Sequence, residues 1–230
     1  MLINHLKEKF ERQQQSSLDF YTPSGIHVYF KQPMVNPIDV EAVMAKIESV
    51  MPSHLLSEIE MIIIGWFEEF EKRSVNAFYD SGAVYASNIQ DNEQDLYDDI
   101  VHELSHALEE SYGYQIYSDN KIMKEFLRKR NVLYDLLWAK GFKAPRSFFN
   151  ETEFNQEFDD FLHKKVGYDK LSPLVQGVFV SPYAATSIRE YFATMFTEFY
   201  FDSNHEFIKK VSPAVYEKIL MLQDPEKLDY

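Results

Sequence analysis

The sequence of 230 residues contains no cysteine. This absence excludes disulfide bonds, thiolate metal ligands and a cysteine nucleophile. A transition-metal site in this chain must therefore use His, Asp and Glu side chains, and the chain has 7 histidines.

Basic residues are scarce. Lys and Arg number 23 against 37 Asp and Glu, which gives a formal net charge of −14. The basic cluster KEFLRKR, residues 124–130, does not offset this charge and is interpreted as a solvated helix face. We therefore expect no nucleic acid as a partner, because binding to phosphates depends on basic side chains.

Long hydrophobic runs are also lacking. The longest apolar run, MIIIGWF at 61–67, is too short to span a bilayer. The N-terminal segment MLINHLKEKFERQQQ is charged throughout and has no apolar core of a signal peptide. We expect no membrane partner, and either a cytoplasmic location or export without a classical signal peptide. Hydrophobic residues still make up 45% of the chain, so a folded core is expected.

Strand patterns come first along the chain and helical patterns follow. Short apolar or β-branched runs predict strands over 25–32, 60–67 and 81–89. Helical spacing of apolar residues predicts helices over 2–15, 37–51, 119–140, 151–165, 169–177, 187–202 and 212–222. This order predicts an α+β fold with a small mixed sheet and a mainly helical C-terminal part. We expect one domain, 1–230, in which 1–112 holds the sheet and 113–230 is helical.

The stretch YDDIVHELSHALEE, residues 97–110, combines two histidines and a glutamate in one helical segment. His102 and His106 are one turn apart on the same face, so both imidazoles can reach one tetrahedral zinc ion. Glu103, beside the first histidine, is placed to act as general base toward a water. The opposite side carries an apolar stripe that would be buried: Tyr97, Val101, Leu104 and Leu108. The alternative is that HExxH arises by chance on an ordinary polar helix.

Two histidines leave zinc one protein ligand short. The metzincin pattern fails, because Glu109 and Tyr112 stand where Gly and His are needed. Glu125 and Glu190, both in later predicted helices, are the candidates for the third ligand. Each also has an ordinary interpretation: Glu125 belongs to a solvated helix face, and Glu190 forms a capping box with Ser187.

The segment VSPYAATSIREYFATMFTEFY, residues 180–200, resembles the second active-site segment of the anthrax lethal factor catalytic domain and the clostridial Pro-Pro endopeptidases. In these gluzincins a Tyr stands seven residues before the zinc-binding Glu, as Tyr183 stands before Glu190 here. An aromatic-aromatic-Ala step then follows, as in Tyr191, Phe192 and Ala193. The region 83–110, a strand followed by HExxH, looks similar as well.

This resemblance implies a zincin-like fold with one zinc ion per chain. It makes His102, His106 and Glu190 the zinc ligands and Glu103 the general base, and it gives Tyr183 the role of hydrogen-bond donor to the oxyanion. The sequence departs from the family at Thr194, where a second acidic residue is frequent. An acidic residue at this position would help to orient the zinc ligands, and Thr194 cannot do so in the same way.

The expected function is therefore that of a zinc-dependent endopeptidase acting on a peptide or protein. An extended substrate would add as a further strand along Val84–Ser87. One alternative is a cytosolic regulatory metallopeptidase of the repressor-cleaving type, which gains if Glu125 binds zinc. The other is a non-catalytic interaction or structural protein with a vestigial HExxH. The cleavage sequence and the oligomeric state are not predicted.

Overall fold

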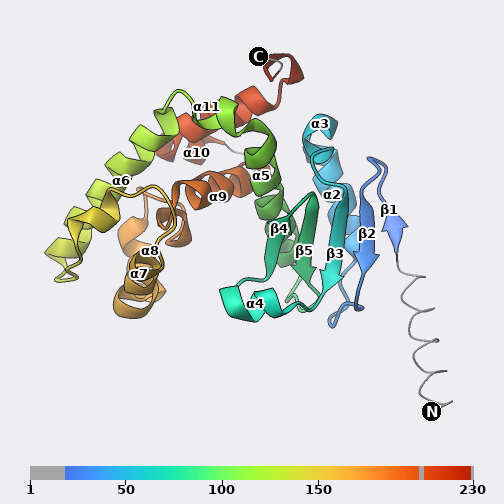
Figure 1. The fold of residues 1–230 in the computed structure, drawn as a ribbon, viewed down its shortest axis with the longest axis horizontal. Helices are drawn as coiled ribbons and strands as arrows, with labels where there is room; N and C mark the ends of the chain where they lie inside the picture. The colour runs from blue at the N-terminus through green and yellow to red at the C-terminus, as the bar shows by residue number, and fades with distance from the viewer. Residues whose placement is uncertain (1–18, 202–204, 229–230) are drawn as a thin grey trace, which may run out of the picture. The chain divides into compact units, whose positions relative to one another are not determined.

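The computed structural model describes residues 19–201 and 205–228. The helix expected over 2–15 lies outside these residues. The chain folds as two compact units, Met1–Ser111 (unit 1) and Tyr112–Tyr230 (unit 2), whose elements are labelled in Figure 1.

Among the described residues, unit 1 contains a five-stranded sheet with the order β1-β2-β3-β5-β4. Strands β2, β3 and β5 are parallel, and the outer strands β1 and β4 pair antiparallel with β2 and β5. The predicted strands 25–32, 60–67 and 81–89 are confirmed as β2, β3 and β5, whereas the sequence patterns predict neither outer strand. The bounds are β1 Phe20–Tyr21, β2 His27–Phe30, β3 Met61–Gly65, β4 Ala77–Asp80 and β5 Ala83–Ser87.

Strand β5 is an interior strand. It pairs with β3 along one side and with β4 along the other. Since both sides of its main chain are occupied, the prediction that a peptide adds along Val84–Ser87 is wrong. Within the described sheet the open edge next to β5 belongs to β4.

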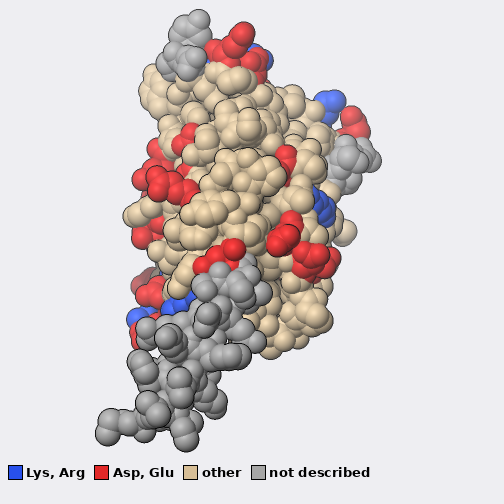
Figure 2. Space-filling model, turned by 90° about the vertical axis from the view of Figure 1, so that its right-hand side faces the viewer, with Lys and Arg blue, Asp and Glu red and all other residues tan. Residues whose placement is uncertain are grey.

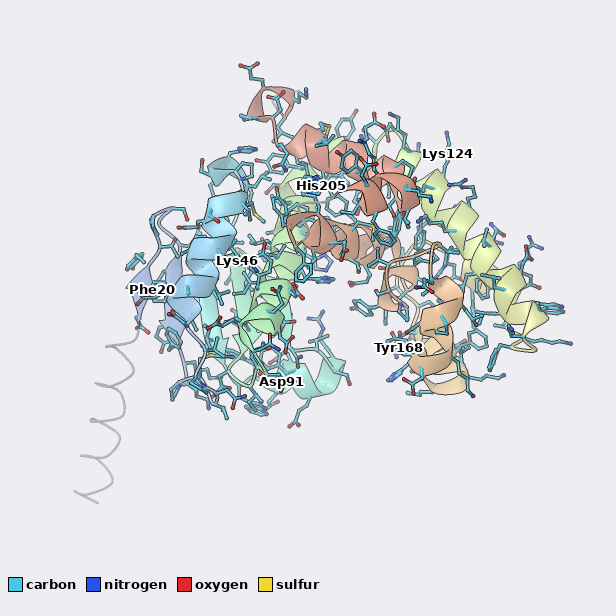
Figure 3. The ribbon with its side chains drawn as sticks, turned by 180° about the vertical axis from the view of Figure 1, so that it is seen from behind. Phe20, Lys46, Asp91, Lys124, Tyr168 and His205 are labelled. Carbon is cyan, nitrogen blue, oxygen red and sulfur yellow. The ribbon has the colours of Figure 1, made fainter. Side chains whose placement is uncertain are left out.

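One face of the sheet is covered by α2 (Val40–Val50) and α5 (Glu93–Tyr117), which lie behind the strands in Figure 1 and in front of them in Figure 3. The two helices are neighbours, because the Lys46 ammonium of α2 lies 4.2 Å from the centroid of the Tyr97 ring of α5. Strand side chains alternate between the two faces of a sheet. Those that are buried on β2, β3 and β5 include Val28, Phe30, Ile62, Ile64, Val84 and Ala86.

Two shorter helices complete the described part of unit 1, α3 (Ser53–Leu56) and α4 (Glu68–Arg73).

Helix α5 has a defined start and an irregular residue near its end. Asn92 Oδ1 accepts hydrogen bonds from the main-chain N–H groups of Gln94 (2.8 Å) and Asp95 (3.1 Å), as a helix N-cap does. Tyr112 departs from helical geometry, with φ −116° and ψ 17°. The boundary between the units falls just before it, so the regular part of α5 that carries HELSH belongs to unit 1.

Unit 2 is built from helices in its described part. The helices predicted over 119–140, 169–177, 187–202 and 212–222 are confirmed as α6, α8, α9 and α11. The helix predicted over 151–165 begins later, and its second half is π-helical. The bounds are α6 Lys121–Ala139, α7 Gln156–Asp160, α8 Tyr168–Val175, α9 Ile188–Phe201, α10 Glu206–Val211, α11 Pro213–Leu222, the π-helix η2 Phe161–Val166, and the 3-10 turns η1 Arg146–Phe149, η3 Tyr183–Ala185 and η4 Pro225–Lys227. The expected α+β class, with a small mixed sheet and a helical C-terminal part, is confirmed.

Two surface properties bear on possible partners. Within 19–201 and 205–228, no helix has both the length and the apolar character needed to cross a bilayer. Figure 2 shows one face of the molecule, on which acidic side chains are widespread and basic ones are sparse, in keeping with the net charge of −14.

Candidate metal centre

The apolar stripe of α5 fixes which way the histidines face. As predicted, its members are all buried, at 1% exposure or less: Tyr97, Val101, Leu104 and Leu108. His102 and His106 lie on another face and are partly exposed. Their ring centroids are 5.1 Å apart and the ring planes are inclined by 79°. The two imidazoles are therefore adjacent, as the HExxH spacing requires.

Glu103 is held by the main chain of β4. Its Oε2 accepts a hydrogen bond of 2.8 Å from the main-chain N–H of Tyr79, and its residue is only 9% exposed. The Tyr79 hydroxyl donates to Glu110 Oε2 at 2.8 Å and accepts from the main-chain N–H of Gly82 at 3.1 Å. Burial, together with the hydrogen bond to Glu110, raises the pKa of Tyr79. One β4 residue thus contacts α5 at two points that are two helical turns apart.

Two further carboxylates lie close to the histidines. Burial raises the pKa of Asp99 to about 6; the hydrogen bond from Gln90 Nε2 (2.8 Å) opposes this shift, and the charge of Glu103 adds to it. Glu109 Oε2 lies 2.7 Å from His106 Nδ1. Neither carboxylate is predicted from the sequence to have a role at the site. For Glu109 the signal was present, since a residue three positions after His106 lies on the same side of a helix.

Glu190 lies in the first turn of α9, and a local cap fixes its main chain. Ser187 Oγ accepts a hydrogen bond of 3.1 Å from the main-chain N–H of Glu190. This bond is the main-chain half of the capping box, and it does not involve the Glu190 carboxylate. The charge of Glu190 also contributes, after burial and Asp159, to raising the pKa of Tyr168 to about 12. Tyr168, at the start of α8, is labelled in Figure 3.

Tyr183 and the start of α9 are held in place by a buried arginine. Arg130 is fully buried, and its Nη1 donates to the main-chain oxygens of Ala185 and, at 3.5 Å, Thr186. The Tyr183 main-chain oxygen in turn accepts from Thr186 N (2.9 Å) and Thr186 Oγ1 (2.8 Å). Hydrogen bonds from Arg130 and from Thr186 therefore fix the main chain of the 3-10 turn that carries Tyr183.

The same guanidinium joins this turn to a second segment. Arg130 Nη2 donates to the main-chain oxygens of Phe148 (2.7 Å) and Glu151 (3.0 Å). A further hydrogen bond of 2.8 Å links Ile188 N to Thr152 O. Burial lowers the pKa of Arg130, and the carbonyl oxygens that accept from its two Nη atoms replace part of the water that the guanidinium has lost.

Glu125 has a structural role in unit 2. Its Oε1 accepts from the Tyr191 hydroxyl at 2.7 Å, and its Oε2 accepts from the main-chain N–H of Ala214 at 3.0 Å, in the first turn of α11. At 8% exposure it is buried, so its interpretation as part of a solvated helix face is wrong. Lys129 and Arg130 are buried too, so the same interpretation fails for the end of the 124–130 cluster.

Three side chains form a group that could hold a metal ion: His102, His106 and Glu190. Each offers one ligand atom, and these atoms lie within 4.8 Å of one another. Glu125, the other candidate, does not belong to this group. Two imidazoles and one carboxylate are a donor set that suits zinc and leaves a fourth position for water or substrate. The residues present therefore fit the metal that the sequence predicts.

No protein-family model, no curated protein and no solved structure matches this chain. The likeness to the gluzincins therefore rests on the residues of the two segments 83–110 and 180–200.

Replacing Arg130 tests how the Tyr183–Glu190 segment is supported. Arg130→Met should lower the free energy of unfolding by about 2–5 kcal/mol, because hydrogen bonds from a charged donor contribute ~1.5–3 kcal/mol each. Urea denaturation measures the change. The matched control is Arg128→Met, an exposed position on the same helix, for which a change within about 0.5 kcal/mol is expected. Equal stability of the two variants would contradict the role given to Arg130.

Proposed function

We propose that this chain is a zinc-dependent endopeptidase of the gluzincin type, with a zincin-like domain similar to that of the anthrax lethal factor. The observation that carries the proposal is the His102, His106 and Glu190 group, together with the buried Glu103 next to the first histidine. The two histidines and Glu190 would bind the metal. Glu103 would act as general base, and Tyr183 would stabilise the oxyanion.

The reaction is the hydrolysis of a peptide bond. A zinc ion held by these residues would supply Lewis acidity, which lowers the pKa of a bound water and polarises the scissile carbonyl. Glu103 removes a proton from the attacking water as the new C–O bond forms. It then delivers this proton to the leaving nitrogen as the C–N bond breaks, so one water is consumed and a carboxylate and an amine are produced.

The surroundings of Glu103 suit this role. Its Oε2 is held by the Tyr79 main-chain N–H, which fixes the direction of the carboxylate. The bond uses one oxygen and leaves Oε1 for the proton of the water. Two metal-binding histidines and a carboxylate can also serve iron(II) in oxygenases. A buried carboxylate beside the first histidine is what favours hydrolysis.

An extended substrate would add to the outer edge of β4. Along an antiparallel strand, the main-chain groups of successive residues point alternately toward the partner strand and away from it. Tyr79 donates its N–H to Glu103 and not to β5, so its main-chain groups point away from β5. Ala77, two residues earlier, points the same way. A peptide paired along this edge would lie next to the strand that holds the general base, which supports a peptide or protein as the substrate.

Metal binding should depend on Glu190 and not on Glu125. We expect wild type to bind one zinc ion per chain. His102→Ala and Glu190→Gln should lose most of it, because each removes a ligand. Glu125→Gln should keep it, since its carboxylate serves Tyr191 and Ala214. Elemental analysis of the purified, untagged proteins measures the zinc content.

The three variants also separate the alternatives. Loss of zinc only in Glu125→Gln would favour the repressor-cleaving type of metallopeptidase. Absence of zinc from wild type, even after supplementation, would leave HELSH as an ordinary helix face and contradict the proposal.

Glu103→Gln should abolish most of the turnover without loss of zinc. Gln retains an oxygen that can accept the Tyr79 N–H, but it cannot take up a proton. The rate should fall by ~10²–10⁴-fold, the usual contribution of a general base. Cleavage of a peptide library by mass spectrometry measures turnover, beside zinc content. A variant as active as wild type would remove Glu103 from the mechanism.

Tyr183→Phe should reduce kcat by ~10²–10³-fold, as the loss of one oxyanion donor does elsewhere. Zinc content should stay unchanged, because the role proposed for the hydroxyl is toward the oxyanion and not toward the metal. Loss of zinc from this variant would show a structural role for the hydroxyl instead.

A further inference from the structure

Glu109 forms a close, buried contact with one of the candidate metal ligands. Its Oε2 lies 2.7 Å from His106 Nδ1, and the two residues are three positions apart on α5. The side chains of His106 and Glu109 are only 13% and 4% exposed. The next residue, Glu110, is exposed and accepts from the Tyr79 hydroxyl. Of these two adjacent glutamates, only Glu109 is thus directed at the His106 imidazole.

This contact determines which imidazole nitrogen carries the proton. An ionised carboxylate can only accept hydrogen bonds, so Nδ1 must be the donor. In a neutral imidazole the lone pair then lies on Nε2. Since metals bind the nitrogen with the lone pair, the contact selects Nε2 as the ligand atom of His106.

We propose that Glu109 is a positioning residue, which fixes the tautomer and the ring orientation of His106 so that Nε2 binds the metal. This inference rests on the proposed metal site. The role of Glu109 is additional to that site, because neither the HExxH spacing nor the resemblance to the gluzincins assigns a role to this position. The carboxylate also makes the imidazole a better ligand, as such partners do in other metal sites.

The burial of Glu109 argues against an ordinary surface pair. Exposed i,i+3 pairs on helices contribute little to stability and keep much of their hydration. A buried carboxylate loses its water and needs a partner of good geometry in return. The His106 Nδ1–H is such a partner, so the two side chains are arranged as a pair.

The test compares zinc affinity in full-length proteins that have been stripped of metal. Competition with a chromophoric chelator gives the dissociation constant of zinc. Glu109→Ala should bind zinc ~10–100-fold more weakly than wild type. Glu109→Gln, which keeps an accepting oxygen but loses the charge, should fall between them. Glu110→Ala is the matched control, one residue away on the same helix, and should bind zinc as wild type does.

A second readout needs no metal. Long-range ¹H–¹⁵N NMR of the imidazole rings should show the Nδ1–H tautomer of His106 in metal-free wild type and in Glu109→Gln. In Glu109→Ala the Nε2–H tautomer should become populated. A residue that only supports the fold would change stability without changing this tautomer, so the spectrum separates positioning from general support.

The possible results are distinct. Wild-type zinc affinity in Glu109→Ala, an equal loss in Glu110→Ala, or an unchanged His106 tautomer would each overturn the role of Glu109 and leave the metal site standing. Failure of wild type itself to bind zinc would overturn the proposed function, and the role of Glu109 with it.

Discussion

The hydrogen bond from the Tyr79 main chain to Glu103 is the interaction on which the geometry of unit 1 depends. A carboxylate that is only 9% exposed needs a donor, because burying one without a partner is costly. The donor here comes from a strand, so α5 cannot slide or rotate against β4 without losing it. The Tyr79 hydroxyl also donates to Glu110 two turns later, but Glu110 is exposed, so this second bond constrains the helix far less. With the apolar stripe buried, the two histidines are left on a defined face.

In unit 2, hydrogen bonds to main-chain atoms hold the segment that carries Glu190. The first turn of α9 is capped by Ser187, and the preceding turn is held by the carbonyl contacts of Arg130. Because these contacts use main-chain atoms, the side chains of Tyr183 and Glu190 are not needed for them. Glu125 shows the opposite case: both of its oxygens support α11 and Tyr191. Glu125 therefore supports the fold of unit 2 through its side chain.

The features that could be predicted from the sequence are those that depend on residues close together along the chain. The spacing of His102 and His106, the buried stripe beneath them and the three central strands all follow from short-range periodicity. Strand β4 escaped prediction because its four residues, AFYD, show no alternation and become a strand only by pairing with β5. The Ser81-Gly82 turn, with φ of 50° and 83°, was the available sign of a hairpin. The roles of Glu125 and Arg130 depend on partners distant in sequence, which no local pattern encodes.

The electrostatics of α5 give a reason for a cation at this place. Asp99, Glu103 and Glu109 bring three carboxylates to the helix segment that carries the histidines. They accept hydrogen bonds from a side-chain amide, a main-chain N–H and an imidazole, respectively. When ionised, three carboxylates on one helix segment create a negative potential around the two rings. A divalent ion bound to His102 and His106 would lie in that potential, and the same residues that order the helix would therefore favour metal binding.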